Sequence, residues 1–339
     1  MGERTQVRQV RAASETKPDD ECDPGLAARA FGSRARPHDH ADLGAGQVSA
    51  MLADLRRTLH DRFGTSDEDR LDSLLRESGL GELGPAAPDE RRKTQVLVVP
   101  VRFHVIHSGR RGLLSKQAAY RQVATLNAAY GGRRGGADTG VRFRLTSFGT
   151  TNNSAWFYRP RRYEGSMKRR LRRGGRASLN IYTAAVGADV LGFSTFPQWY
   201  RKRPHMDGVV VDYRSLPGGS FSRFDRGYTA VHEIGHWLGL FHTFENGCRP
   251  PGDGVADTPY EARPADGCPL VRDTCPQRGR DPVHNFMNYA QDACMSEFTA
   301  GQGRRIRVAW AAYRSPRSAR LVGLGTGSAT GTRSVGAAG

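Results

Sequence analysis

Apolar residues follow a helical period near the start of this chain. Between Gln47 and Phe63 they recur every three or four positions, which predicts an amphipathic helix. Gly64 then provides a helix stop. Thr65 and Glu68 have the spacing of a capping box, which predicts a second helix that runs to about residue 76. The sequence therefore predicts a pair of helices over roughly residues 47–76.

Beyond residue 95 the pattern changes to that of strands alternating with a few helices. We expect strands over 96–106, 141–148, 179–182 and 208–213, an edge strand over 191–196 that ends at Pro197, and helices over 115–130 and about 301–313. A further helix follows the strand over 208–213. This order predicts an α+β fold, in which a twisted mixed sheet has one backing helix and a second helix that carries the site described next.

The stretch from His232 to His242 has the form H-E-x-x-H-x-x-G-x-x-H. On a helix, residues four apart lie one turn apart on the same face, so His232 and His236 can present two imidazoles to one ion, with Glu233 beside them. His242 would point elsewhere if the helix continued. Gly239 can adopt the left-handed conformation that ends helices, which allows the third histidine to fold back.

Three neutral nitrogen ligands with one open position are typical of a catalytic zinc site, because structural zinc sites fill all four positions. A bare H-E-x-x-H also occurs by chance in ordinary helices. The additional glycine and third histidine at fixed offsets argue against coincidence, and we predict that His232, His236 and His242 bind Zn²⁺.

The charge of the chain invites a different interpretation, as a nucleic-acid-binding protein. The chain of 339 residues has a formal net charge of +17. Its densest basic run, Arg159 to Arg176, contains nine Arg or Lys and one glutamate, but apart from Tyr163 it lacks the interleaved aromatic residues of a base-stacking surface. We interpret this run as a solvated basic face and expect no nucleic-acid partner. No stretch approaches the roughly 20 apolar residues of a membrane span, so no membrane partner is expected either.

Four of the five cysteines cluster shortly after the histidine motif, namely Cys248, Cys268, Cys275 and Cys294. We expect disulfides that stabilise an irregular region, although four cysteines allow three pairings. A second zinc site is the alternative, but no C-x-x-C pair is present. Disulfides imply an oxidising compartment, whereas residues 1–11 show no apolar signal-peptide core. We therefore expect secretion, with a truncated or misassigned start or another export route.

The chain divides into three expected units. Residues 1–44 are polar and without periodicity, and residues 81–88 form a Gly/Pro/Ala-rich linker that leads to a basic, cleavable sequence at 89–93. We expect a pro-segment over 1–93, a catalytic domain over 94–314 and a flexible tail over 315–339. Cys22, in the first unit, is either a latency switch whose thiolate occupies the open zinc position or an incidental thiol.

The sequence resembles the metzincin metallopeptidases and, more narrowly, the pappalysin family. The resemblance covers about residues 94–313. It rests on the histidine motif, on Asn285-Phe286-Met287-Asn288-Tyr289 as a methionine turn, on Asp207-Gly208-Val209-Val210, on Leu216-Pro217-Gly218-Gly219, and on the Cys-Pro pairs at 268 and 275. It implies a two-lobed metzincin-type fold with an irregular, disulfide-bonded C-terminal lobe.

The resemblance also assigns roles. It implies that Glu233 is the general base, that Met287 lies beneath the metal and that Tyr289 stabilises the oxyanion or reversibly binds zinc. Taken alone, Met287 and Tyr289 would be ordinary core residues. The family's substrates bind by β-augmentation to an edge strand, which corresponds here to Leu191, Gly192, Phe193 and Ser194. The family's interleaved disulfides map to Cys248–Cys275 and Cys268–Cys294.

Two further assignments are carried over. The family binds calcium near the loop that follows the motif, where Asp253, Asp257, Thr258 and Glu261 offer oxygen ligands, although a solvated acidic loop is the alternative. Asp292 is a candidate acid in a specificity pocket for basic substrate residues. The sequence departs from the family at Asn288, where Asp is common.

These features predict a secreted, monomeric zinc metalloendopeptidase, made as a latent precursor, that acts on proteins or peptides. The alternative is a catalytically silent protein that uses the cleft or the basic face to hold an acidic partner. A nucleic-acid-binding protein is a weaker third hypothesis.

Overall fold

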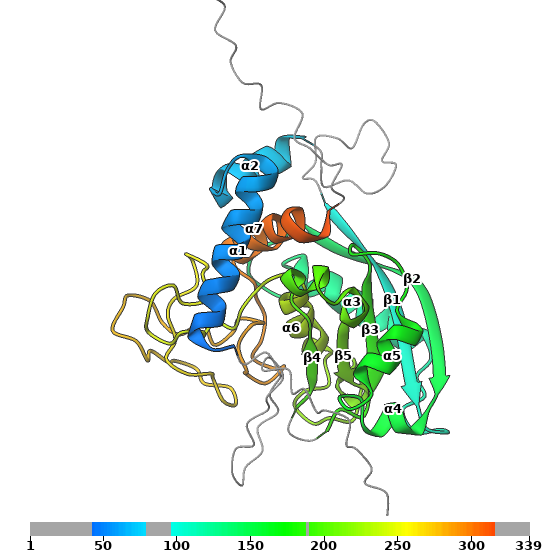
Figure 1. The fold of residues 1–339 in the computed structure, drawn as a ribbon. Coiled ribbons are helices and arrows are strands. Elements are labelled where there is room, and N and C mark those ends of the chain that lie inside the picture. The colour runs from blue at the N-terminus through cyan, green and yellow to red at the C-terminus, as the bar shows by residue number, and fades with distance from the viewer. Residues whose placement is uncertain (1–42, 79–95, 188–189, 316–339) are drawn as a thin grey trace, which may run out of the picture.

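The computed structural model describes residues 43–78, 96–187 and 190–315 (Figure 1). The predictions for Cys22, for the polar start, for the linker with its cleavage sequence and for the tail beyond residue 315 lie outside the described residues. Within the described ranges, no helix combines the length and the apolar character that crossing a membrane requires.

A five-stranded sheet in the order β2-β1-β3-β5-β4 occupies one side of the molecule, on the right in Figure 1. Its strands are β1 Leu97–His107, β2 Val141–Asn152, β3 Leu179–Ala184, β4 Gly192–Ser194 and β5 Val209–Asp212. All neighbours are parallel except β4, which pairs antiparallel with β5 and forms one edge. The mixed α+β architecture predicted from the sequence is confirmed, although the edge strand is shorter than the 191–196 expected.

Helices cover both faces of the sheet because alternate strand residues point to opposite sides. Val209 and Val211 pack into one apolar cluster with α3 (Lys116–Tyr130) and α6 (Tyr228–Trp237). Val210 points to the other face, into a cluster with Phe157 of α4 (Ser154–Tyr158) and Met167 of α5 (Glu164–Leu171). The sequence predicted one backing helix and missed α4, which is only five residues long, and α5, whose few apolar residues lie within a strongly basic run.

Short 3-10 turns connect the strands near the sheet edge. η1 (Pro197–Arg201) and η2 (Pro204–Met206) lie between β4 and β5, and η3 (Tyr213–Ser215) follows β5. After α6 the chain is irregular until α7 (Ala300–Ala309), which continues into a π-helical turn, η4 (Trp310–Arg314). Two disulfides, Cys248–Cys275 and Cys268–Cys294, cross-link this irregular lobe in the interleaved pairing that the resemblance implies.

The N-terminal helices α1 (Ala45–Phe63) and α2 (Glu68–Ser78) form a hairpin beside α7 (Figure 1). Leu59 and Leu71 are fully buried against Val308, Ala311 and Ala312. The start of α2 differs in detail from the prediction. Asp67, whose carboxylate accepts the backbone N–H of Arg70 at 3.0 Å, caps this helix because it directly precedes Glu68, while Thr65 accepts the N–H of Asp67.

Candidate metal centre and cleft

Helix α6 carries two of the three predicted ligands on one face. His232 and His236 lie one turn apart, and their Nε2 atoms are 3.2 Å from each other. The Nε2 atom of His242 lies 3.1 Å from that of His236. All three side chains are buried, and in the described part of the chain they are the one group of potential ligand side chains found clustered around a common point.

Gly239 brings His242 back to the helix. Its φ of +102° lies in the region that favours glycine, and the backbone N–H of Leu240 donates to the carbonyl of Gly235 at 2.9 Å. A Cβ at Gly239 would also come within 2.9 Å of the Ala309 side chain. The turn predicted from the spacing is therefore present, and two separate constraints require glycine there.

The outer nitrogens of the three rings determine how the inner nitrogens are protonated. The Nδ1 of His232 lies 2.6 Å from the carbonyl of Phe286, and that of His236 lies 2.8 Å from the carbonyl of Leu240. A carbonyl can only accept, so each Nδ1 carries the proton. His242 Nδ1 lies 3.0 Å from the carboxylate of Glu245.

The inner Nε2 atoms of the neutral rings are then three lone-pair donors that face one another. This donor set fits zinc, which is typically bound by neutral imidazoles whose other nitrogen is hydrogen-bonded. Glu245 was not predicted from the sequence as a residue of the site. The only indication in the sequence that Glu245 contacts a ligand is its position three residues after His242, just past the turn at Gly239.

Glu233 lies between the histidines and the sheet edge. It is 1% exposed, and a Cβ at Gly192 of β4 would come within 2.8 Å of its side chain. The absence of a side chain at residue 192 thus allows the carboxylate to lie directly beneath the edge strand.

Met287 and Tyr289 approach the histidines from the C-terminal lobe. Met287 is fully buried, and its sulfur is the atom that a Cβ at Gly235 would meet first, so it packs against α6 between His232 and His236. The hydroxyl of Tyr289 lies 3.2 Å from Nε2 of His242. Both residues therefore adjoin the three-histidine cluster, and the roles that the resemblance implies for them stay predictions.

A pocket opens beside His232 and Glu233. Its lining includes Leu191, Tyr228, Asn288, Tyr289 and Asp292. Asp292 is 2% exposed, and its carboxylate accepts the backbone N–H of Arg226 at 2.8 Å. Burial raises the pKa of Asp292 to about 7.

The four candidate calcium ligands do not gather at one point. Thr258 donates to the carboxylate of Asp253 at 2.7 Å. Asp257 instead accepts the backbone N–H of Gly301 at the start of α7, at 2.8 Å. Glu261 is bound by Thr243, Asn288 and Arg272. Calcium binding stays a prediction.

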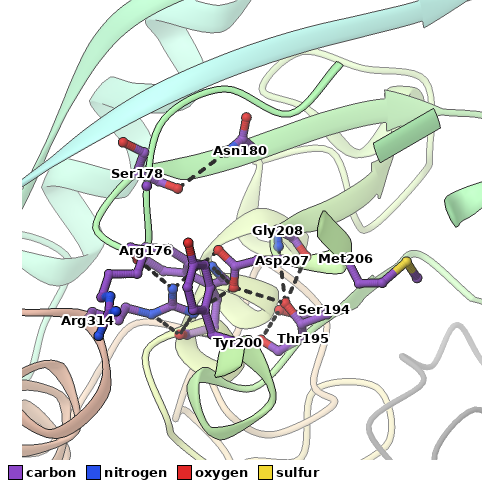
Figure 2. Close-up of polar contacts among 12 residues, drawn as sticks. Arg176, Ser178, Asn180, Ser194, Thr195, Tyr200, Met206, Asp207, Gly208 and Arg314 are labelled. Atoms are coloured by element: carbon purple, nitrogen blue, oxygen red, sulfur yellow. Dashed lines mark hydrogen bonds and ion pairs between the residues drawn. The ribbon is translucent and has the colours of Figure 1, made fainter. Parts of the chain in front are cut away.

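A buried ion pair ties the edge strand to the metal-binding helix (Figure 2). The guanidinium of Arg314 is completely buried and donates to both carboxylate oxygens of Asp207 and to the carbonyl of Trp237, the last residue of α6. Asp207 also accepts from the indole of Trp237 at 3.1 Å. Thr195, just after β4, accepts the N–H of Gly208 at 3.1 Å, so the end of β4 is held beside the end of α6.

Comparison with known proteins gives a consistent result. A family model described as pregnancy-associated plasma protein-A, peptidase family M43, matches residues 208–311. An extracellular metalloprotease of Podospora anserina is 38% identical over 301 residues, which are 87% of this chain and 97% of that protein. Extracellular metalloprotease 1 of Coccidioides posadasii is 42% identical over 221 residues, 63% of this chain and 76% of that protein.

Solved structures with a similar fold come from Tannerella forsythia. Mature mirolysin in complex with a cleaved peptide has 25% identity and a TM-score of 0.56, covering 68% of this chain and 97% of that one. A promirolysin mutant has 23% identity and a TM-score of 0.62, covering 83% of this chain and 95% of that one.

Proposed function

This chain belongs to the pappalysin family of metalloproteases (peptidase family M43), and from that premise we propose that it is a secreted zinc endopeptidase made as a latent precursor. The observation that carries the proposal is the set of three mutually facing Nε2 atoms, with Tyr289 beside them and with Glu233 next to the edge strand β4. Zinc, when bound there, supplies a Lewis acid that lowers the pKa of water to about 7 and polarises a carbonyl.

The residues around the histidines can perform the remaining steps of peptide hydrolysis. Glu233 takes a proton from the attacking water and passes it to the leaving amine nitrogen. The hydroxyl of Tyr289 donates a hydrogen bond to the developing oxyanion of the scissile carbonyl. β4, which no further strand of the described sheet pairs on its outer side, aligns the substrate backbone by strand addition, and an internal segment of a polypeptide can pair in this way as well as an end.

Asp292 gives the adjoining pocket a preference for substrates with a basic side chain in this proposal. Its buried carboxyl lies at the pocket wall, and a bound cation would favour the ionised form. The carboxylate also holds the backbone before α6, so its two roles have to be separated by comparing substrates rather than by activity alone.

Secretion and latency are supported by the relatives. The similar fungal proteins are named extracellular metalloproteases. Promirolysin covers a larger share of this chain than mature mirolysin does, as expected if residues 1–93 are a pro-segment. None of the residues that line the pocket comes from α1 or α2, so we assign latency to residues before α1, with Cys22 as the candidate zinc-binding thiolate.

The test uses the purified chain, before and after trimming, with casein and arginine-containing peptides. We expect cleavage that o-phenanthroline abolishes and added zinc restores. Glu233→Gln should keep the zinc content and lose at least about a hundredfold in kcat, as expected for loss of a general base. Absence of chelator-sensitive cleavage after trimming would contradict the proposal. Full activity of Glu233→Gln would show that Glu233 is not the general base.

A further inference from the structure

One segment of the chain carries most of the excess positive charge. Residues 159–206 contain twelve Arg or Lys and two acids, which gives this stretch a net charge of +10 out of +17 for the whole chain. One of the acids, Glu164, is buried and forms an ion pair with Lys168 at 2.6 Å. The other acid, residue 189, lies outside the described residues. The described acid of this stretch is therefore paired with a buried cation.

We call the following exposed cations of this stretch the basic face: Arg169, Arg170, Arg173, Arg201, Lys202 and Arg203. Helix α5 and the turn η2 are in contact, since a guanidinium nitrogen of Arg169 lies 3.5 Å from His205. The guanidinium of Arg172 lies over the ring of Tyr200, 5.4 Å from its centroid, and joins the end of α5 to η1. Two segments separate in sequence thus meet in one patch.

The electrostatic state of His205 reflects the positive potential here. Burial, and then the charges of Arg169, Arg203 and Arg172, lower its pKa. The clustered cations therefore already disfavour further positive charge on this face. A negatively charged group brought to the same place would be favoured for the same reason.

The basic face begins where the edge strand ends. β4 continues through Thr195 directly into η1, and the contacts among Thr195, Asp207 and Gly208 hold this junction in place (Figure 2). Asp207 is in turn fixed by the buried guanidinium of Arg314. The patch is thus rigidly positioned relative to the strand that would align the substrate.

The orientation of the substrate decides which of its residues reach the patch. Antiparallel strand addition is the slightly more stable pairing. The pocket is lined by Leu191, at the beginning of β4. A substrate antiparallel to β4 would place the residues after the scissile bond near that pocket and the residues before it past Ser194, toward η1. Three extended residues and a five-residue 3-10 turn span roughly 10–20 Å, about three to six residues of extended substrate.

We propose that the basic face is an exosite that binds acidic residues of a polypeptide substrate about three to six positions before the scissile bond. The inference rests on the proposed peptidase function and adds a substrate class to it. Each exposed ion pair contributes little alone, but several together should change kcat/KM by about 3-fold to 10-fold at low ionic strength.

The experiment compares three peptides that share one cleavable core in the trimmed, zinc-loaded protein. One has three Asp at the fourth to sixth positions before the cut, one has three Asn there, and one has three Asp at the corresponding positions after the cut. We expect the first peptide to have the highest kcat/KM, mainly through a lower KM, and the advantage to disappear at about 0.5 M salt, where charges are screened within a few ångströms.

Charge-neutralising variants test whether the basic face is responsible. Arg169→Gln combined with Arg170→Gln and Arg173→Gln should reduce the ratio of kcat/KM for the first Asp peptide to kcat/KM for the Asn peptide to about 1. The Asn peptide itself should be cleaved as before. The matched control is Lys116→Gln with Arg121→Gln and Arg133→Gln, three exposed cations on or after α3, across the sheet from α5, which should keep the preference.

Two results would overturn the exosite. One is equal cleavage of all three peptides, or a preference for acid after the cut. The other is retention of the protein on immobilised polyphosphate, lost in the triple variant, without any preference among peptides, which would identify a general polyanion surface. If no peptide is cleaved at all, the peptidase proposal fails instead, so the two failures are distinguishable.

Discussion

At the scale of single residues, the metal centre depends on groups that do not themselves face the metal. The carbonyls of Phe286 and Leu240 and the carboxylate of Glu245 hold the three outer ring nitrogens. Each of these contacts fixes both the orientation of a ring and the position of its proton. Of the three groups, only Glu245 acts through a side chain and can be removed by substitution.

We therefore expect Glu245→Ala to weaken zinc binding by about 10-fold to 100-fold, the usual effect of losing such a partner. The measurement is competition with a chromophoric chelator on purified protein. Glu297→Ala, a glutamate outside the three-histidine contacts, is the control and should bind zinc like the unchanged chain. Unchanged affinity in Glu245→Ala would show that the contact with His242 does not organise the ligand.

At the scale of secondary-structure elements, the N-terminal hairpin is joined to the last helix of the fold. Besides the apolar contacts, Arg307 of α7 forms a bidentate ion pair with Asp72 of α2, at 2.6 and 2.8 Å. Arg305 pairs with Glu68 at 2.9 Å. At the other end of α1, Val48 and Leu52 pack with Phe196 and Phe241, and the Phe196 ring lies against that of His236. The hairpin thus supports the rear of the metal centre without lining the pocket.

Because α1 and α7 share one apolar cluster, we expect them to unfold together. Leu59→Ala, at a fully buried position, should cost about 2–5 kcal/mol and lower the melting temperature of the untrimmed chain as a single transition. Leu113→Ala, at a leucine that is 50% exposed, is the control and should have little effect. A separate, early transition confined to the hairpin would show instead that α1 and α2 are an independent unit.

At the scale of the whole molecule, buried carboxyls make stability depend on pH. Burial raises the pKa of Asp253, Glu261 and Asp292 to about 7 each, well above the values of an unfolded chain. The folded chain then binds more protons than the unfolded chain between about pH 4 and pH 7. The unfolding free energy contributed by these groups is highest below about pH 4 and falls as pH rises through 7.

Asp253 allows this dependence to be tested away from the metal centre. Asp253→Asn cannot titrate, so its unfolding free energy should fall by less between pH 5 and pH 8 than that of the unchanged chain, the difference being about 2–3 kcal/mol. Urea denaturation at the two pH values measures it, with the exposed Asp273→Asn as control. Added calcium that stabilises the unchanged chain at pH 8, but not Asp253→Asn, would favour the calcium prediction and contradict a protonated Asp253.

The features of this protein that depend on local spacing could be predicted from the amino-acid sequence. The period of four between His232 and His236 places both rings on one helix face, and only glycine at 239 permits the return of His242. The alternating and buried apolar runs likewise predicted the strands. In each case the relevant interaction lies within a few residues along the chain, so its geometry follows from helix and strand periods.

Which residues distant in sequence lie in contact could be seen only in the tertiary structure. No local pattern links Arg314 to Asp207, Leu59 to Val308, or Arg169 to His205, because these contacts are long-range. Local patterns also could not distinguish among the three possible disulfide pairings. Nor could they show that the four candidate calcium ligands, although close in sequence, bind to different partners in the structure. The reason is physical: such contacts depend on how the sheet, the helices and the irregular lobe pack, and that packing is set by the burial of the whole chain rather than by any one segment.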